Sequence, residues 1–475
     1  MTLEIEVDGI LDEKEWSQAK EITKYYESLP FTLNDASGSQ KVLVLEDEDG
    51  IYFGFINFQD EETIRVQKHQ RDDEMANADM VGVSIDFDGD GLLSYGFSIS
   101  AGGSILDNVV RNENEVNYDW DSDWGHGVSI GKDVWYAEMF IPWSVAPMKA
   151  QKGDKRRVRL SFYRWLVSEY IVRSTIKGNA MTEKFISIFN EYEFNNYDVS
   201  KIDYFPYVNL SEDRVLEEDR TKVGAEIFWK IDAGKQLNVA INPDFGQVES
   251  DELVVNFDSS ETFSSDKRPF FAENNNMFDV SDRMHRIINT RRIGGRPEYD
   301  CSAYGDLEEY CRQNRANTSE IDFALKYTQK GNVDFGVMTA SERDEKFSQG
   351  RDFYAFRLNT KSNNLKYGYL GTYVDKPVTG ENAQVNSFDF LYLPSEIHRM
   401  NGNFMHSNVD NQDGFGLTLG YAYNPNRDFS SGIGINYYDD RLDLNDMGYL
   451  ILNDRFMFNG RTQFKRTTFD EGSIL

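Results

Sequence analysis

The sequence predicts an all-β protein in which an N-terminal β-sandwich precedes a C-terminal antiparallel transmembrane β-barrel, incomplete in this chain. Apolar and polar residues alternate with period two in both halves, and Gly- and Asp-rich turns separate these runs. No apolar run reaches the roughly 18 residues that a transmembrane helix needs, whereas a barrel strand needs only about ten alternating residues. We place the two domains at residues 1–195 and 196–475.

Composition narrows the range of partners. Lys and Arg number 50 against 81 Asp and Glu, which gives a net charge of -31. Nucleic acid would be repelled by such a chain, so it is excluded as a partner. Aromatic residues make up 14% of the sequence, with 26 Tyr and 33 Phe. This enrichment suits sheets with aromatic girdles, or surfaces that stack on sugars.

Short alternating runs dominate the first half, at residues 42–45, 51–55, 80–85 and 92–99. Turn-separated strands at this spacing predict a β-sandwich. Trp16 and Trp135 occupy apolar positions of the pattern, so we expect both in the core, whereas Trp143 follows a proline at a strand exit and stays ambiguous.

An acidic turn between two of these strands raises the question of a metal. Asp86, Asp88 and Asp90 are spaced like the start of an EF-hand calcium loop. The twelfth position of such a loop must be a bidentate Glu, but here it is Phe97, so the EF-hand interpretation fails. Asp and Gly are also the residues that a tight hairpin requires. We therefore favour a hairpin without metal; calcium on these three carboxylates is the alternative, and no other cofactor is predicted.

The second half shows the clearest alternation. Aromatic and aliphatic residues share one face of the expected strands, and Gly or polar residues share the other; these strands are 321–327, 333–337, 365–373, 415–423 and 433–437. A soluble sandwich would give the same alternation. Tyr at strand ends, long charged loops such as 341–346, and the lack of intervening helices favour a membrane barrel closed as a meander.

The two ends of the sequence do not look like those of an exported barrel. Met1 runs directly into a strand-like segment, without the basic and apolar regions of a signal peptide. The last residues, 471–475, lack the terminal aromatic of a barrel strand. We expect a mature, trimmed or incomplete sequence that lacks part of the barrel.

Two cysteines, Cys301 and Cys311, lie close together in a polar stretch. A disulfide that closes a surface loop in an oxidising compartment is the simplest interpretation, and two free thiols are the alternative. A metal site is disfavoured because no His lies nearby.

Residues 242–294 carry a family resemblance. The motifs Asn-Pro-Asp-Phe-x-Gln-Val-Glu, Lys-Arg-Pro-Phe-Phe-x-Glu and Arg-Arg-Ile-Gly follow one another there. This junction resembles that of a bacterial family of outer-membrane proteins (DUF5916), in which a carbohydrate-binding domain of the family 9 type precedes an uncharacterised β-barrel. The first half resembles that domain through Val7-Asp8-Gly9 with Trp16. The resemblance implies an outer-membrane location, with polysaccharide or oligosaccharide and outer-membrane lipid as partners.

Candidate sugar-binding residues follow from the chemistry of the ligand. A pyranose needs a flat aromatic face and planar polar groups, and Trp120 and Trp124 lie in an acidic setting that includes Asp119. Each Trp is equally open to a role in the core. Arg71 and Asp79 lie in a stretch whose equivalent, in the related domains, helps to shape the sugar or calcium site; a solvated turn is the alternative.

Catalysis is disfavoured by the sequence. Glu113, Glu115 and Asp119 offer paired carboxylates for glycoside hydrolysis, but carboxylates are abundant in so acidic a chain. No Ser-His-Asp or Cys-His set is recognisable. A membrane-associated glycoside hydrolase therefore remains an alternative, as does a transport or structural barrel whose sandwich docks or gates without binding sugar.

The junction also contains several charged residues. Arg268, Arg291 and Arg292 lie near Glu249 and Glu273 in the sequence, and we expect them to form buried ion pairs in the barrel lumen. That structural role is preferred over substrate binding.

Overall fold

A computed structural model of the 475-residue chain describes residues 3–73, 76–118, 120–179, 184–213, 218–243, 266–395, 397–426 and 428–465. The predicted all-β class is confirmed. The described residues form two compact units that meet in sequence between Val199 and Ser200. Within them, no helix has the length and apolar character to cross a membrane.

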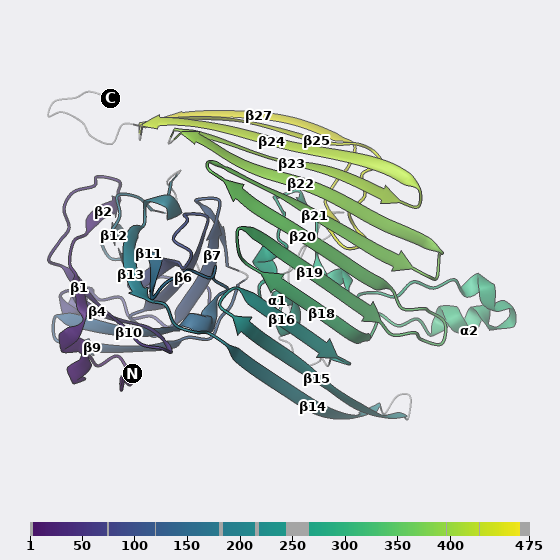
Figure 1. The fold of residues 1–475 in the computed structure, drawn as a ribbon, viewed down its shortest axis with the longest axis horizontal. Coiled ribbons are helices and arrows are strands. Elements are labelled where there is room, and N and C mark those ends of the chain that lie inside the picture. The colour runs from purple at the N-terminus through teal and green to yellow at the C-terminus, as the bar shows by residue number, and fades with distance from the viewer. Residues whose placement is uncertain are drawn as a thin grey trace. The chain divides into compact units, whose positions relative to one another are not determined.

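The first unit is a sandwich of two antiparallel sheets (Figure 1). One sheet consists, in spatial order, of β1 (Lys20–Ile22), β3 (Gln40–Glu46), β4 (Gly50–Phe58), β10 (Val134–Pro142) and β9 (Gly125–Gly131). The other consists of β2 (Tyr26–Leu29), β12 (Ile171–Ser174), β11 (Lys155–Leu166), β5 (Met80–Asp86), β6 (Leu93–Ser100), β7 (Ile105–Arg111) and β8 (Glu115–Asn117), and β13 (Asn190–Asn195) pairs with β11. Four short 3₁₀ helices connect them: η1 (Lys14–Gln18), η2 (Glu61–Thr63), η3 (Trp143–Val145) and η4 (Ile186–Ile188).

Aromatic rings from the two sheets meet in the core of the sandwich. Phe162 on β11 lies between Phe53 and Phe55 of β4, with ring centroids 5.5 and 6.1 Å apart. All three are fully buried, and so is Trp135 on β10. Trp16 is buried as well, so both tryptophans predicted for the core are there.

The second unit is built on one antiparallel sheet of 12 strands (Figure 1). In spatial order these are β14 (Lys201–Asp213), β15 (Glu218–Asp232), β16 (Lys235–Ile241), β18 (Ile321–Gln329), β19 (Val333–Glu342), β20 (Asp352–Ser362), β21 (Leu365–Lys376), β22 (Glu381–Ser395), β23 (His398–Val409), β24 (Gln412–Asn426), β25 (Phe429–Tyr438) and β27 (Arg455–Phe464). The five strands predicted in this half all lie within these elements. In the part of the chain that the structure describes, β14 and β27 are unpaired edges, so the expected closed meander appears here as an open sheet.

One face of this sheet is covered by chain from the same unit. We call residues 266–299 the inner segment; it contains α1 (Pro269–Ala272), η5 (Asn275–Met277), β17 (His285–Arg286) and η6 (Thr290–Arg292). Its Phe270 and Phe271 are buried in one cluster with Leu370 of β21 and Met405 of β23. β17 pairs with β26 (Tyr449–Leu450). We call the covered side the inner face and the other side the outer face.

A disulfide loop follows the inner segment. Cys301 and Cys311 are joined by a disulfide, with Cα atoms 5.6 Å apart. The loop contains η7 (Cys301–Leu307) and α2 (Glu308–Gln313), and α2 projects beyond the strand ends of the sheet (Figure 1). The cysteines thus close a surface loop, as the sequence predicts.

Candidate functional site

A partly exposed polar cluster in the sandwich centres on Arg71. Its guanidinium donates hydrogen bonds to Asp107 of β7, at 2.8 Å, and to the carbonyl of Ser122, also at 2.8 Å. It also forms ion pairs with Asp121 at 2.9 Å and with Asp72 at 3.5 Å. The cluster therefore fastens the loop before β5 to the loop between β8 and β9.

The carboxylates of this cluster are crowded. Ligand oxygens of Asp72, Asp107 and Asp121 lie within 4.8 Å of one another, a spacing that suits a cation. The guanidinium of Arg71 supplies the positive charge among them. Burial raises the pKa of Asp72 to about 7, and it also raises the pKa of Asp107. The number of protons on the cluster therefore changes near neutral pH.

The structure separates the two candidate sugar platforms. Trp124 is only 5% exposed and packs on Phe97, with centroids 5.6 Å apart, so it is a core residue. Trp120 is half-buried and rests on Tyr95 at 4.9 Å and on Phe97 at 5.8 Å. Because Asp121, its neighbour in sequence, pairs with Arg71, Trp120 lies next to the charged cluster. It remains the candidate platform.

The other predicted sugar contacts are Asp79, Asp119 and Arg71. Asp79 is fully buried and accepts hydrogen bonds from the side chain of Gln59 and from the backbone amides of Arg65 and Val167. These contacts make Asp79 a structural anchor and leave it unable to reach a ligand. Asp119 lies outside the described residues. Arg71 is partly exposed and stays a candidate.

The calcium candidates form a hydrogen-bonded hairpin connection. The carboxylate of Asp86 accepts from the amides of Asp88, Gly89 and Gly91, at 3.2, 2.9 and 2.7 Å. Asp90 forms an ion pair with Lys149 at 2.7 Å, and the Lys149 amide donates to Asp88 at 2.6 Å. These contacts give the carboxylates partners within the protein, which favours the hairpin over a calcium ligand set.

The carboxylates considered for hydrolysis have structural contacts. Glu113 is buried and accepts from the amides of Phe185 and Ser187 at 3.0 and 3.1 Å. Glu115 accepts from the side chain of Asn112 at 2.8 Å. Glu113 thus holds the chain around the start of η4 in place, through two amides that share its Oε2.

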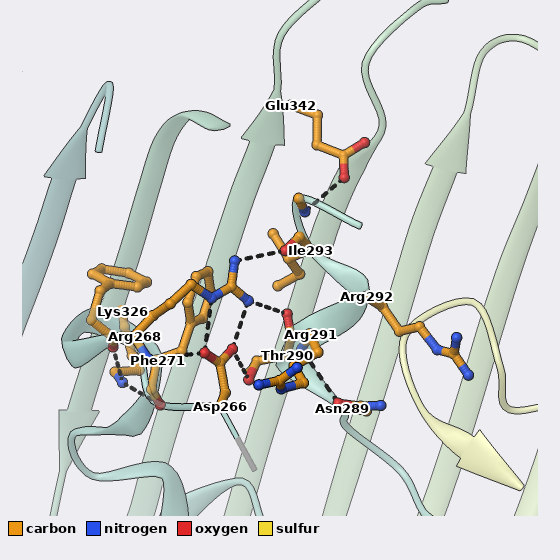
Figure 2. Close-up of polar contacts among 12 residues, drawn as sticks. Asp266, Arg268, Phe271, Asn289, Thr290, Arg291, Arg292, Ile293, Lys326 and Glu342 are labelled. Atoms are coloured by element: carbon orange, nitrogen blue, oxygen red, sulfur yellow. Dashed lines mark hydrogen bonds and ion pairs between the residues drawn. The ribbon is translucent and has the colours of Figure 1, made fainter. Parts of the chain in front are cut away.

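In the second unit, polar contacts fix the inner segment (Figure 2). Arg268 pairs with Asp266 at 2.6 Å and donates to the carbonyls of Thr290 and Ile293 at 2.7 and 2.8 Å. Burial opposes ionisation of Asp266, but hydrogen bonds from Arg268 outweigh it and lower its pKa. The guanidinium also lies over the ring of Phe271, 4.2 Å from its centroid. The start of the segment is thereby tied to η6.

Residues of the sheet also bind the inner segment. Lys326 of β18 donates to the carbonyls of Phe270 and Glu273 at 2.5 Å each. Figure 2 shows Lys326 close to Phe271 of α1. Glu342 of β19 accepts from the amide of Gly294 at 2.8 Å and pairs with Arg351 at 2.8 Å. These buried charges are satisfied by the segment, so they fix where it sits on the sheet.

The predicted ion pairs of the junction need correction. Arg268 pairs with Asp266, and Glu273 pairs with Lys230 of β15 at 3.6 Å. Arg292 donates to the carbonyl of Gly448 at 3.2 Å. Glu249 lies outside the described residues. Arg268 thus pairs with a carboxylate two residues away, and only Glu273 takes its partner from a strand of the sheet.

Sequence reasoning missed the acceptors around Arg71. Asp107 looks like an ordinary polar position of β7, and nothing in its neighbours distinguishes it from other carboxylates in an acidic chain. Lys326 lies in the polar phase of its strand, as Asp322 does, so nothing in the sequence showed that it would be buried. Such a position requires a buried partner or solvent.

Comparison with known proteins gives a domain match and weak structural overlaps. Residues 200–347 match the model of a family described as a domain of unknown function, DUF5916, so the predicted resemblance is confirmed for that region. No curated protein matches the chain. A crystal structure of a candidate carbohydrate-binding protein from Bacteroides uniformis covers 38% of this chain and 88% of its own, at 13% identity and a TM-score of 0.30. An anion-selective porin from Comamonas acidovorans covers 94% and 96%, at 9% identity and a TM-score of 0.27. Both overlaps are too loose to argue from.

Proposed function

We propose that this chain is an outer-membrane protein whose 12-stranded sheet faces lipid and whose sandwich binds polysaccharide or oligosaccharide without chemical change. Two surfaces support this: the outer face of the sheet and the neighbourhood of Trp120. The outer face of the sheet is the stronger support.

The outer face of the sheet is apolar in successive rows of paired residues. One such row contains Tyr369, Phe388, Phe404, Leu417, Tyr437 and Phe456. Phe388, Phe404 and Phe456 are 54%, 45% and 67% exposed. A contiguous exposed apolar surface of this size marks an interaction with lipid or with another protein.

Polar rows bound this surface at both ends. On β23, Asn408 lies in the row of Gln384 and Asp413, and His398 lies in a row that contains Ser431. Asn408 and His398 are ten residues apart in sequence, or roughly 33 Å along a strand. With the usual strand tilt of about 40°, the span between these bounds is about 25 Å tall, which is the height of the apolar band in outer-membrane barrels; Asn386 and His406 are polar residues near one end of it. The band height favours lipid as the occupant.

The opposite face of the same strands is filled by a hydrophobic cluster with the inner segment and by paired polar residues. Arg357 of β20 pairs with Asp389 of β22 at 2.5 Å, and both are on the inner face. Asn403 of β23 bonds to Ser387 at 2.6 Å. An exposed apolar face outside, with paired charges among the buried residues inside, is the distribution of a membrane barrel wall, whereas a water-soluble sheet exposes polar residues.

The sugar-binding part rests on Trp120. A half-exposed indole held by Tyr95 offers a fixed flat surface, and the partly exposed guanidinium of Arg71 lies nearby through Asp121. Aromatic faces pack on the apolar side of a sugar ring, and planar polar groups bond its hydroxyls. The cluster thus has both components of a shallow sugar site.

One experiment tests both parts on the full-length protein in detergent micelles and in liposomes. We expect the protein to insert into liposomes, and to bind glycans on an array in a way that Trp120→Ala abolishes. Tyr170→Ala removes another exposed aromatic of the sandwich and is the matched control. Insertion without glycan binding would leave a membrane protein whose sandwich docks or gates. A protein that stays in the aqueous phase would contradict the membrane assignment.

A further inference from the structure

The disulfide loop carries two exposed aromatic rings in a fixed arrangement. Tyr304 and Tyr310 both pack on the ring of Phe347, with centroids 5.1 and 5.8 Å from it. Phe347 is buried in one cluster with Cys301 and Cys311. Tyr304 and Tyr310 are nevertheless 39% and 49% exposed. Each ring therefore offers a surface to solvent while its contact with Phe347 holds it in place.

The loop is constrained before any ligand arrives. The disulfide between Cys301 and Cys311 closes the stretch of chain that contains both tyrosines. A closed loop has fewer conformations to lose when it binds a ligand, so less conformational entropy opposes binding. The two rings thus form a small preorganised surface.

Polar groups surround the two rings. The carboxylates of Asp306 and Glu309 are exposed on the same loop. Glu308 forms an ion pair with Arg312 at 2.5 Å. The ammonium of Lys346 lies over the ring of Tyr310, 5.0 Å from its centroid, and adds a donor beside it. The loop therefore combines aromatic rings with acceptors and a donor for hydroxyl groups.

The loop projects from the end of the sheet at which the long connections gather (Figure 1). The long connections at this end are residues 242–320, 343–351 and 439–454. The connections at the other end are short and include residues 233–234, 330–332 and 363–364. In outer-membrane barrels the long connections are extracellular and the short turns periplasmic. With the sheet in the outer membrane, the loop lies on the outside of the cell.

We propose that the disulfide loop binds a neutral oligosaccharide at the cell surface. The rings of Tyr304 and Tyr310 pack on the apolar side of the sugar, and the carboxylates of Asp306 and Glu309 accept from its hydroxyls. The proposal rests on the proposed function for the extracellular position of the loop. It adds a second glycan site, separate from the candidate site of the sandwich.

Charge and size select the class of ligand. Residues 300–313 contain four carboxylates and one arginine, in a chain with a net charge of -31, so an acidic glycan is repelled. The exposed apolar side chains of the loop are Tyr304, Leu307 and Tyr310. A stable protein interface buries roughly 800 Å² on each partner, which is large for three side chains. A short neutral glycan fits this surface better than a protein does.

The test uses the full-length Trp120→Ala protein in micelles of a detergent without a sugar headgroup, and follows binding by ligand-observed NMR. Because the loop is open to solvent, we expect affinities that are roughly millimolar, too weak to survive the washing of a glycan array. The probes are cellohexaose, xylohexaose and mannohexaose, with oligogalacturonate as the acidic probe. At least one neutral probe should bind. Tyr304→Ala/Tyr310→Ala should weaken that binding by roughly tenfold or more, because two stacking contacts are lost.

Two control variants separate a site from a general effect. Tyr354→Ala/Tyr367→Ala removes two tyrosines of the outer face, each 47% exposed, and should leave binding within about twofold of the parent. Tyr304→Phe/Tyr310→Phe keeps both rings and should retain most of the binding. The phenylalanine variant distinguishes lost stacking from a loop whose structure the alanine variant has disturbed.

A third variant tests the charge selection. Oligogalacturonate should bind at least roughly tenfold more weakly than the neutral probe. Asp306→Asn/Glu309→Gln should narrow this difference, since the repulsion falls while the amides still bond hydroxyls. Any of five results would overturn the proposal: no neutral probe binds, the outer-face variant weakens binding equally, the phenylalanine variant binds no better than the alanine variant, oligogalacturonate binds as tightly as the neutral probe, or the amide variant leaves the ratio unchanged.

Failure of this proposal is distinguishable from failure of the proposed function. Liposome insertion tests the sheet, and array binding that Trp120→Ala abolishes tests the sandwich; neither depends on Tyr304 or Tyr310. If both hold while the Trp120→Ala protein binds no probe by NMR, only the proposal for the loop fails. A protein that stays in the aqueous phase contradicts the proposed function, whatever the loop binds.

Discussion

In the sandwich, Phe53, Phe55 and Phe162 meet between two sheets, whereas in the 12-stranded sheet Phe388 and Phe404 point away from the chain that covers the other face. Both regions use the same alternation of period two. In the first region the apolar half of the pattern is the core. In the second, apolar residues also form the outer surface, and the buried half combines a hydrophobic cluster with charged residues such as Lys326 and Arg357, which bond to the inner segment and to Asp389.

The difference lies in what each unit must cover. Two sheets that pack face to face exclude water from their apolar sides, so polar residues are left outside. A sheet that faces lipid needs no such cover, and its inner face must be filled by something compatible with polar side chains. The inner segment does this here, through backbone carbonyls that accept from Lys326 and an amide that donates to Glu342.

The largest loss of stability is expected when an aromatic ring is removed from the core of the sandwich. Phe162→Ala should lower the free energy of unfolding of the sandwich by about 3–5 kcal/mol, because it leaves a cavity between the two sheets. Six of the seven Trp precede Val199, so denaturant unfolding followed by Trp fluorescence reports mainly on this unit. Phe58→Ala, on β4 of the other sheet and 50% exposed, should cost less than about 0.5 kcal/mol. Equal costs would mean that Phe162 is not part of a packed core.

Membrane insertion should be sensitive to a charge on the outer face, and not to a smaller side chain there. Phe404→Arg places a charge in the middle of the apolar band and should cost about 2–4 kcal/mol of membrane stability. The fraction of protein inserted into liposomes, read after urea titration, measures this. Asn401→Arg lies on the same strand but on the inner face and should insert like the parent protein. A soluble, monomeric Phe404→Arg variant that is more stable than the parent would instead identify the outer face as water-exposed.

Loss of one anchor of the inner segment should lower the local stability of that segment moderately. Lys326→Met leaves the carbonyls of Phe270 and Glu273 without their donor and should weaken local structure by about 1–3 kcal/mol. Hydrogen exchange of the α1 amides Phe271 and Ala272 should quicken accordingly, by tenfold or more. Lys346→Met, an exposed lysine, is the control and should leave this exchange unchanged.

The smallest effect concerns the pH dependence of the folding stability of the sandwich. Burial raises the pKa of Glu138 to about 7, and its Oε2 accepts from the amides of Asp8 and Gly9 at 3.0 and 2.7 Å. A folded carboxyl with a raised pKa binds more protons than the unfolded one between its ordinary pKa and pH 7, so stability falls as pH rises through that window. Glu138→Gln should flatten the fall between pH 5.5 and 8 by about 1–2 kcal/mol. A parent protein that gains stability over this range would contradict the assignment.

Much of the fold could be predicted from the sequence, because it depends on local periodicity. The strands around residues 42–45, 321–327 and 415–423 and the disulfide loop all follow from alternation, turn residues and cysteine spacing. The candidate site could be predicted only in part. Trp120 and Arg71 stay candidates, whereas Asp79 is a buried anchor. Both Trp120 and Trp124 pack on Phe97 of β6, and only the fold decides that Trp124 is buried while Trp120 is partly exposed.

What the sequence by itself determined is the period of each strand, the places where the chain turns, and the excess of negative charge. Only the tertiary structure decided which half of each pattern is buried, which carboxylates surround Arg71, and that Tyr304 and Tyr310 both pack on Phe347. The physical reason is that alternation fixes the two faces of a strand but not what lies against either. Pairing register and the segment that packs on the sheet set those neighbours, and both join residues far apart in the chain.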